Sequence, residues 1–184
     1  MIWATTCFEV ARRERTFFGG DGNDRLYGGY GGYDQLVPGS GDDSLNGGPG
    51  LGDRAVYQEA QDPVIVSLQD GTAAGTGTGT DSLTGLENII GSQSNDTLTG
   101  DAGPNYISDG NNGADTIHGL DGDDVVFSGD GNDTIDGGLG NDSLRGNGGD
   151  DSLDGGDGDD ALWGGNGTDT CTNGETNRGC EGQQ

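Results

Sequence analysis

The chain contains no lysine and little of what builds an ordinary globular core. Its 184 residues include only seven basic side chains, all arginine, against 33 acidic ones, which gives a net charge of −26. Leu, Ile, Val and Phe together make up less than a fifth of the chain. Few large apolar residues with a high net charge are typical of disordered chains. Something other than apolar burial must therefore hold any fold together.

These shortages also exclude several classes of function. Without a basic patch, the chain is not expected to bind nucleic acid or an anionic membrane surface, and no apolar run has the length needed for membrane insertion. The single histidine, His118, rules out an H-E-x-x-H zinc motif, and no G-x-S-x-G elbow is present. The sequence therefore predicts that the chain by itself is not an enzyme.

Glycine and aspartate, by contrast, are abundant and recur in a fixed register. From residue 91 to 172 the chain reads as nonapeptides such as SGDGNDTID (128–136) and GGLGNDSLR (137–145), while the segment 109–118 is one residue longer. The repeats align one column of aspartates, interrupted by Asn105: Asp96, Asp115, Asp124, Asp133, Asp142, Asp151, Asp160 and Asp169. A column in one register predicts a repeat architecture rather than solvated loop acids.

An apolar residue follows two places after each aspartate. This column reads Leu98, Ile107, Ile117, Val126, Ile135, Leu144, Leu153, Leu162 and Cys171. A first block, residues 19–57, shows the same pattern less regularly, with insertions at 28–37 and 47–57. Its aspartates are Asp24, Asp34, Asp43 and Asp53.

The repeat itself predicts a local structure. Its glycine-rich part suits a tight turn, because glycine tolerates positive φ, and its last residues suit a short strand with one inward side chain. Two turns and two strands make a coil of about 18 residues, and stacked coils form two parallel sheets. An apolar column that contributes about 1.5–3 kcal/mol per buried residue cannot easily offset a backbone entropy of about 1–2 kcal/mol per ordered residue. We therefore expect metal binding and folding to be coupled.

These residues resemble the haemolysin-type calcium-binding repeat, the RTX family, whose nonapeptide is G-G-x-G-x-D-x-U-x with U apolar. The resemblance implies an all-β fold, a right-handed parallel β-roll or β-solenoid with Ca²⁺ in its turns. It also implies several calcium ions as cofactors and partners, held by turn carbonyls and by aspartates one coil apart. The implied pairs are Asp96 with Asp115, Asp115 with Asp133, Asp133 with Asp151, Asp151 with Asp169, Asp124 with Asp142, Asp142 with Asp160, Asp24 with Asp43, and Asp34 with Asp53.

The chain divides into five segments. Residues 1–18 form an N-terminal cap or a truncated segment, 19–57 the first repeat block, 91–172 the second, and 173–184 a C-terminal tail. Between the blocks, 58–90 is a β-rich spacer that should continue the solenoid with longer turns. Alternating Val64, Val66 and Leu68 predict a strand there, and the Thr/Gly run 75–80 predicts a flexible surface turn.

Two cysteines lie close together near the end of the chain. Cys171 and Cys180 suit a disulfide, since an acidic, glycine-rich composition is typical of extracellular proteins. The alternative is that Cys171 only fills the apolar column. Cys7 has no assigned role.

The predicted function is calcium binding by a secreted, extracellular module that folds on extracellular Ca²⁺. Extracellular calcium modules bind with a Kd of about 10⁻⁴–10⁻³ M, which suits a chain that stays unfolded until export. The alternative is the C-terminal calcium-binding module of a larger secreted hydrolase, toxin or adhesin, whose catalytic part lies outside this chain.

Overall fold

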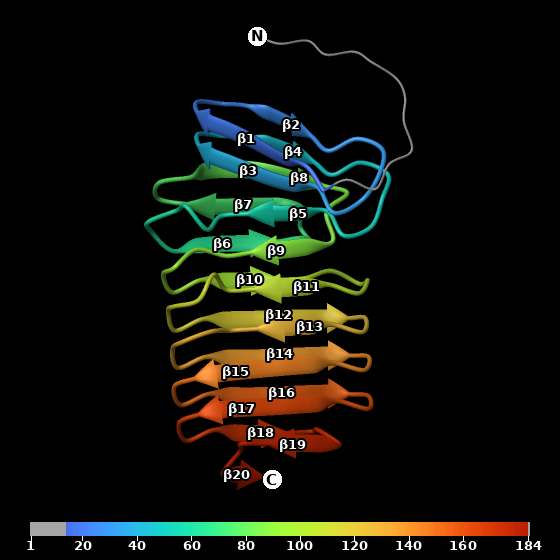
Figure 1. Ribbon diagram of the computed structural model, residues 1–184, viewed down its shortest axis with the longest axis vertical. Coiled ribbons are helices and arrows are strands. Elements are labelled where there is room, and N and C mark those ends of the chain that lie inside the picture. The colour runs from blue at the N-terminus through green and yellow to red at the C-terminus, as the bar shows by residue number, and fades with distance from the viewer. Residues whose placement is uncertain (1–13, 184) are drawn as a thin grey trace.

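The computed structural model describes residues 14–183, which form a stack of β-strand coils (Figure 1). The chain alternates between two sheets. The nine-stranded sheet, sheet A, contains β1 (Thr16–Asp21), β3 (Gln35–Ser40), β5 (Arg54–Val56), β9 (Asn88–Ile90), β11 (Tyr106–Ser108), β13 (Val125–Phe127), β15 (Ser143–Gly148), β17 (Ala161–Asn166) and β19 (Thr176–Arg178), in that order.

The second sheet, sheet B, has eleven strands. Their order is β2 (Arg25–Tyr27), β4 (Ser44–Asn46), β8 (Gly79–Thr84), β7 (Thr72–Gly75), β6 (Val64–Ser67), β10 (Thr97–Thr99), β12 (Thr116–Asp121), β14 (Thr134–Leu139), β16 (Ser152–Asp157), β18 (Thr170–Thr172) and β20 (Gly182–Gln183). Among residues 14–183 no helix is long and apolar enough to cross a membrane. The predicted all-β, parallel solenoid is confirmed.

Each coil pairs with the next in register. Ile117 of β12 lies opposite Ile135 of β14, which lies opposite Leu153 of β16, all in parallel. The apolar column therefore faces inward at every level, between the two sheets. Its members are almost completely buried: Leu98, Ile107, Ile117, Val126, Ile135, Leu144, Leu153, Leu162 and Cys171. The core is narrow, because each strand contributes little more than one such side chain.

Several strands are longer than the repeat predicts. β12 and β14 to β17 each span six residues, because parallel pairing continues through the glycines that follow the apolar residue. Gly138 and Gly156 pair in this extension with φ of +105° and +91°. A side chain on Gly156 would collide with the carbonyl group of Gly138. The glycines thus serve the close stacking of coils as well as the turns.

The spacer continues the solenoid differently from our expectation. In sheet A, β5 passes directly to β9 in parallel. In sheet B the spacer adds β6, β7 and β8, and β7 runs antiparallel to both neighbours. Val64 and Val66 are buried as the alternation predicts, but Thr78, within the run expected to be a surface turn, is also buried. That run makes the tight connection of a β-hairpin, in which Thr76 and Gly77 are exposed as a surface turn predicts.

The first strand begins at Thr16, inside the segment set apart as a cap. Residues 1–13, with Cys7, lie outside the described part of the chain.

The outer faces of the two sheets differ in chemistry. On sheet A, Arg145 lies between two aromatic rings, with its guanidinium carbon 5.1 Å from the ring centroid of Phe127 and 5.0 Å from that of Trp163. On sheet B, His118 lies beside Asp136, with 3.7 Å between nitrogen and oxygen. Phe127 and Trp163, which end their repeats, thus lie with Arg145 on the outer face of sheet A.

Candidate metal-binding turns

The predicted aspartates lie at the two edges of the roll, each in the turn that leads into a strand. All of them are buried except Asp24, which is half-buried. The aspartates that precede strands of sheet B form one line, and the aspartates that precede strands of sheet A form the other. A buried carboxylate requires compensation by hydrogen bonds or by a cation, so the partners of each oxygen decide what these turns can do.

One carboxylate oxygen of each stacked aspartate after Asp24 has a partner. Asp142 Oδ1, for example, accepts a hydrogen bond from the backbone N–H of Asp124, one coil earlier, at 2.8 Å. The same bond joins each pair implied by the resemblance: Asp24 to Asp43, Asp34 to Asp53, Asp96 to Asp115, Asp115 to Asp133, Asp124 to Asp142, Asp133 to Asp151, Asp142 to Asp160 and Asp151 to Asp169. These bonds fix the carboxylates in a ladder along each edge.

The second carboxylate oxygen has none, except in Asp96. The Oδ2 atoms that are buried without a hydrogen-bond partner belong to Asp24, Asp34, Asp43, Asp53, Asp109, Asp115, Asp124, Asp133, Asp142, Asp151, Asp160 and Asp169. An unpartnered buried carboxylate oxygen is strongly disfavoured. A repeated row of them indicates that something other than protein completes each turn.

The glycine at the start of each repeat, which we call the leading glycine, shapes the space around this oxygen. A Cβ placed on Gly137 would collide with Asp142 Oδ2 and would lie 2.6 Å from the carbonyl oxygen of Gly155, one coil later. A carboxylate oxygen and a carbonyl oxygen therefore converge where the glycine leaves room. Carboxylate and carbonyl oxygens are the ligands that Ca²⁺ prefers, so the donor set fits that ion.

Burial also changes the acidity of these groups. It raises the pKa of Asp124 to about 7, and that of Asp142 and Asp151 to about 6, from an ordinary value of 3.8, with neighbouring carboxylates adding to the effect. The ionised form is thus disfavoured unless a cation is close. A divalent ion in the turn would reverse that balance.

Asp96 and Asn105 depart from the regular pattern. Both oxygens of Asp96 are occupied, since Ser92 donates from its backbone N–H at 2.6 Å and from its hydroxyl at 2.7 Å. The Asn105 amide oxygen accepts the N–H of Asp101 at 2.8 Å, and its Nδ2 donates to the Glu87 carbonyl at 2.9 Å. Protein groups alone complete these two turns.

Sequence reasoning missed the acidic residues that extend the two lines. Asp81 accepts the backbone N–H of Asp43 at 2.9 Å, and Glu87 that of Asp53 at 3.0 Å. At the C-terminal end, Glu175 and Glu181 accept the N–H groups of Asp160 and Asp169. Asp81 and Glu87 each precede a buried apolar residue by two places, so the repeat spacing itself contained the signal.

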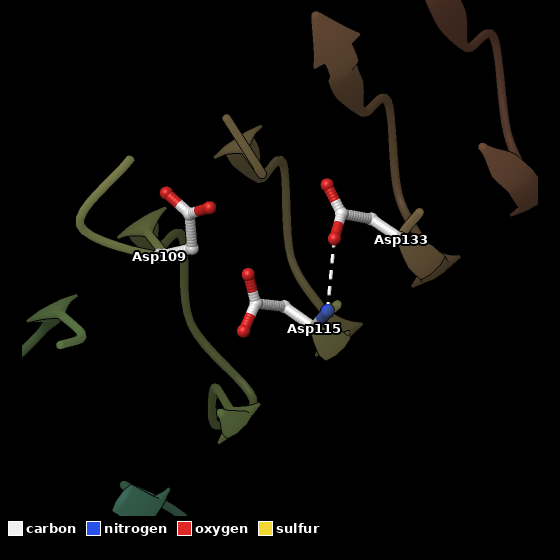
Figure 2. A group of neighbouring side chains, drawn as sticks. All are labelled: Asp109, Asp115 and Asp133. Carbon is white, nitrogen blue, oxygen red and sulfur yellow. Dashed lines mark hydrogen bonds between the residues drawn. The ribbon is translucent and has the colours of Figure 1, made fainter. Parts of the chain in front are cut away.

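Asp109 was missed as well. Its carboxylate lies with those of Asp115 and Asp133, with one oxygen of each within 4.8 Å of the others (Figure 2). Burial, followed by the proximity of Asp115 and Asp133, raises the pKa of Asp109 to about 8. The turn that begins at Asp109 therefore brings together more carboxyl groups than a regular turn.

The structure bonds Cys171 to Cys180, and the Cα atoms are 5.8 Å apart. Cys171 is also completely buried in the apolar column. The two interpretations of this residue are therefore compatible, and the bond ties the C-terminal tail to the last coils.

Comparison with known families identifies the repeats. The RTX calcium-binding nonapeptide repeat matches the chain in four copies, at residues 16–32, 84–108, 109–144 and 137–171, which together cover more than half of it. No curated protein matches the sequence. Repeats of this family bind several Ca²⁺ ions and build a β-roll. The chain therefore belongs to the RTX calcium-binding nonapeptide repeat family.

Proposed function

We propose that the chain is a secreted structural module, without catalytic activity of its own, whose roll folds when it binds extracellular calcium. Calcium binding by a structural β-roll follows from its family. The observation that carries the rest of the proposal is the row of buried Oδ2 atoms without partners. A fold that buries so many unpartnered carboxylate oxygens needs cations to be stable.

The aspartates with an unpartnered Oδ2 are the proposed ligands. In each turn that carboxylate oxygen, together with the carbonyl oxygen of the residue that begins the repeat one coil later, would hold an ion, as at Asp142 and Gly155. Asp96 is a weaker candidate, because Ser92 already occupies both of its oxygens. Calcium supplies the positive charge that lets neighbouring carboxylates ionise together.

The calcium concentration outside cells suits such a switch. Extracellular calcium modules bind with a Kd of about 10⁻⁴–10⁻³ M, and the family is typical of secreted proteins. Without the ion, repulsion among the acidic side chains of a chain with a net charge of −26 counteracts the stabilisation that burial of the narrow apolar column provides. With it, both edges of the roll become cross-linked. The chain would then stay unfolded until export and fold when it meets the higher calcium concentration outside the cell.

The surface supports a role without catalysis. His118, the only histidine of the chain, lies on the outer face of sheet B with its side chain 41% exposed. Its neighbour Asp136 is likewise exposed. The buried acidic groups instead sit in turns, where they accept hydrogen bonds from the backbone of the neighbouring coil.

Far-UV circular dichroism during a calcium titration tests the proposal. The full chain starts in chelator, and magnesium replaces calcium in a parallel titration. We expect a cooperative coil-to-β transition with calcium and none with magnesium, because Mg²⁺ demands a smaller octahedral site and loses its water reluctantly. A β spectrum already present in chelator would overturn the coupling of folding to calcium.

A further inference from the structure

We propose that Asp109, Asp115 and Asp133 form a single three-carboxylate calcium site that fills before the regular turns of the roll. This inference rests on the proposed function, because it concerns calcium binding by the same edge of the same fold. What distinguishes the site is Asp109, which is not an aspartate of the repeat motif.

Asp109 occupies the place of a leading glycine. Gly91 donates its N–H to the Ser108 carbonyl, and Asp109 donates likewise to the Phe127 carbonyl, one coil later. A Cβ on Gly91 would lie 2.7 Å from the Asp109 carbonyl oxygen, the relation that leading glycines have elsewhere in the stack. The side chain of Asp109 therefore starts from a position that carries no side chain in a regular turn.

The neighbouring residues accommodate this side chain. Asp109 Oδ1 accepts the backbone N–H of Asn111 at 2.8 Å, which fixes the carboxylate. Its Oδ2 approaches Gly129, where a Cβ would lie 2.6 Å away, so only glycine fits there. One oxygen of this carboxylate lies near an oxygen of Asp115 and an oxygen of Asp133, and Figure 2 shows the three groups together.

The geometry fits one ion. Calcium binds oxygen at about 2.3–2.6 Å, so two oxygens on the same ion lie at most about 5 Å apart. One oxygen from each of the three carboxylates lies within 4.8 Å of the other two. Each side chain is at most 2% exposed, and each Oδ2 lacks a hydrogen-bond partner. Among residues 14–183 no other three acidic, cysteine or histidine side chains meet in this way.

The extra carboxylate gives the reason for earlier filling. Ligand charge and site rigidity set the affinity of calcium sites over several orders of magnitude. Regular turns offer the carboxylates of the repeat, whereas this one adds a third that is held by a backbone hydrogen bond. In the next coil of the same line a serine, Ser128, replaces the leading glycine, and its hydroxyl donates to the Gly146 carbonyl at 3.1 Å. That turn gains a side chain but no charge.

Equilibrium dialysis of the full chain against calcium alone tests the site. Asp109→Asn keeps the size of the side chain and an oxygen for the Asn111 N–H but removes the charge. We expect one ion to bind the wild type at a free calcium concentration about tenfold or more below the others. We expect Asp109→Asn to lose that step. Asp130→Asn, an exposed change of the same charge in the same region, should keep it.

A second variant guards against misfolding. Asp109→Gly restores the residue of a regular turn and should lose the early step in the same way. The proposal is overturned if both variants keep the early ion, or if either binds one ion more, because Asp109 would then occupy the place of an ion. In both cases the wild type would still fold with calcium. Absence of a calcium-driven β transition in the wild type would instead contradict the proposed function.

Discussion

The substitution Asp142→Asn separates the two roles that the structure gives to a repeat aspartate. Asp142 Oδ1 accepts the N–H of Asp124 at 2.8 Å, and an amide oxygen can accept the same bond. Asp142 Oδ2 is buried without a partner, next to the leading glycine Gly137. The variant therefore keeps the hydrogen-bonded ladder and the volume of the side chain, but removes one negative ligand.

The size of the effect follows from linkage. An ion that binds only the folded state raises the free energy of unfolding by about 1.4 kcal/mol for each tenfold rise in calcium above its Kd. With a Kd of about 10⁻⁴–10⁻³ M, an ion lost from the turn of Asp142 removes about 1.4–2.7 kcal/mol at about 10 mM calcium. If the carboxylate serves ions on both sides, toward Asp124 and toward Asp160, the loss doubles.

Urea unfolding at about 1 mM and about 10 mM calcium, followed by circular dichroism, measures this dependence. The free energy of unfolding should rise less between the two concentrations in Asp142→Asn than in the wild type, by about 1.0–1.3 kcal/mol per ion lost for a Kd of about 10⁻⁴–10⁻³ M. Asp157→Asn, an exposed change at the end of β16, is the matched control and should behave as the wild type. Equal destabilisation at both calcium concentrations would refute the reasoning, because it would assign Asp142 to the ladder alone.

Three further predictions concern the core, the pH dependence and the disulfide. Leu144→Ala should lower the free energy of unfolding in calcium by about 2–5 kcal/mol, because Leu144 is fully buried. Leu139→Ala is the control, since Leu139 is 51% exposed, and should change this free energy by less than about 0.5 kcal/mol in the same urea assay. In chelator, acid should favour the β form. The pKa of Asp124 is about 7 in the folded state against an ordinary value of 3.8, so the folded state binds more protons and its stability falls as the pH rises between these two values. A β signal in circular dichroism that does not increase from pH 8 to pH 5 would contradict this prediction. Cys180→Ser opens the bond to Cys171 and should lower stability by about 2–3 kcal/mol, and the wild type treated with a reductant should unfold at the same urea concentration as this variant.

The regular part of the fold could be predicted because one short period determines it. Asp142 and Leu144 occupy fixed places in a nonapeptide, and the same places recur one coil away, so the stacking partner of each follows from counting residues. The burial of Leu144 and the ladder bond of Asp142 are direct consequences. Contacts between residues more than one coil apart need not be known, since each coil contacts mainly its neighbours.

The irregular parts depended on relations that counting does not reveal. β7 (Thr72–Gly75) consists of small residues without clear alternation, and its antiparallel pairing with β6 and β8 is decided by which strands meet across the hairpin. The place of Asp109 depended on where the extra residue of 109–118 is accommodated. Only the backbone pairing shows that Asp109, rather than Gly110, stands in the glycine column.

The hairpin of the spacer has a consequence for how the roll loses its structure. Neighbour-to-neighbour coupling makes a stack of repeats melt together, and a weak junction divides it into separate cooperative units. On the sheet B edge, the line of stacked carboxylates stops at Asp81 and resumes at Asp96, whose carboxylate accepts the N–H of Val64 rather than that of an aspartate. Sheet A crosses this level by direct parallel pairing of β5 with β9, whereas sheet B crosses it through β8, β7 and β6, two of whose pairings are antiparallel. We therefore expect the coils before the hairpin to melt and reform separately from those after it, which the disulfide ties at their far end.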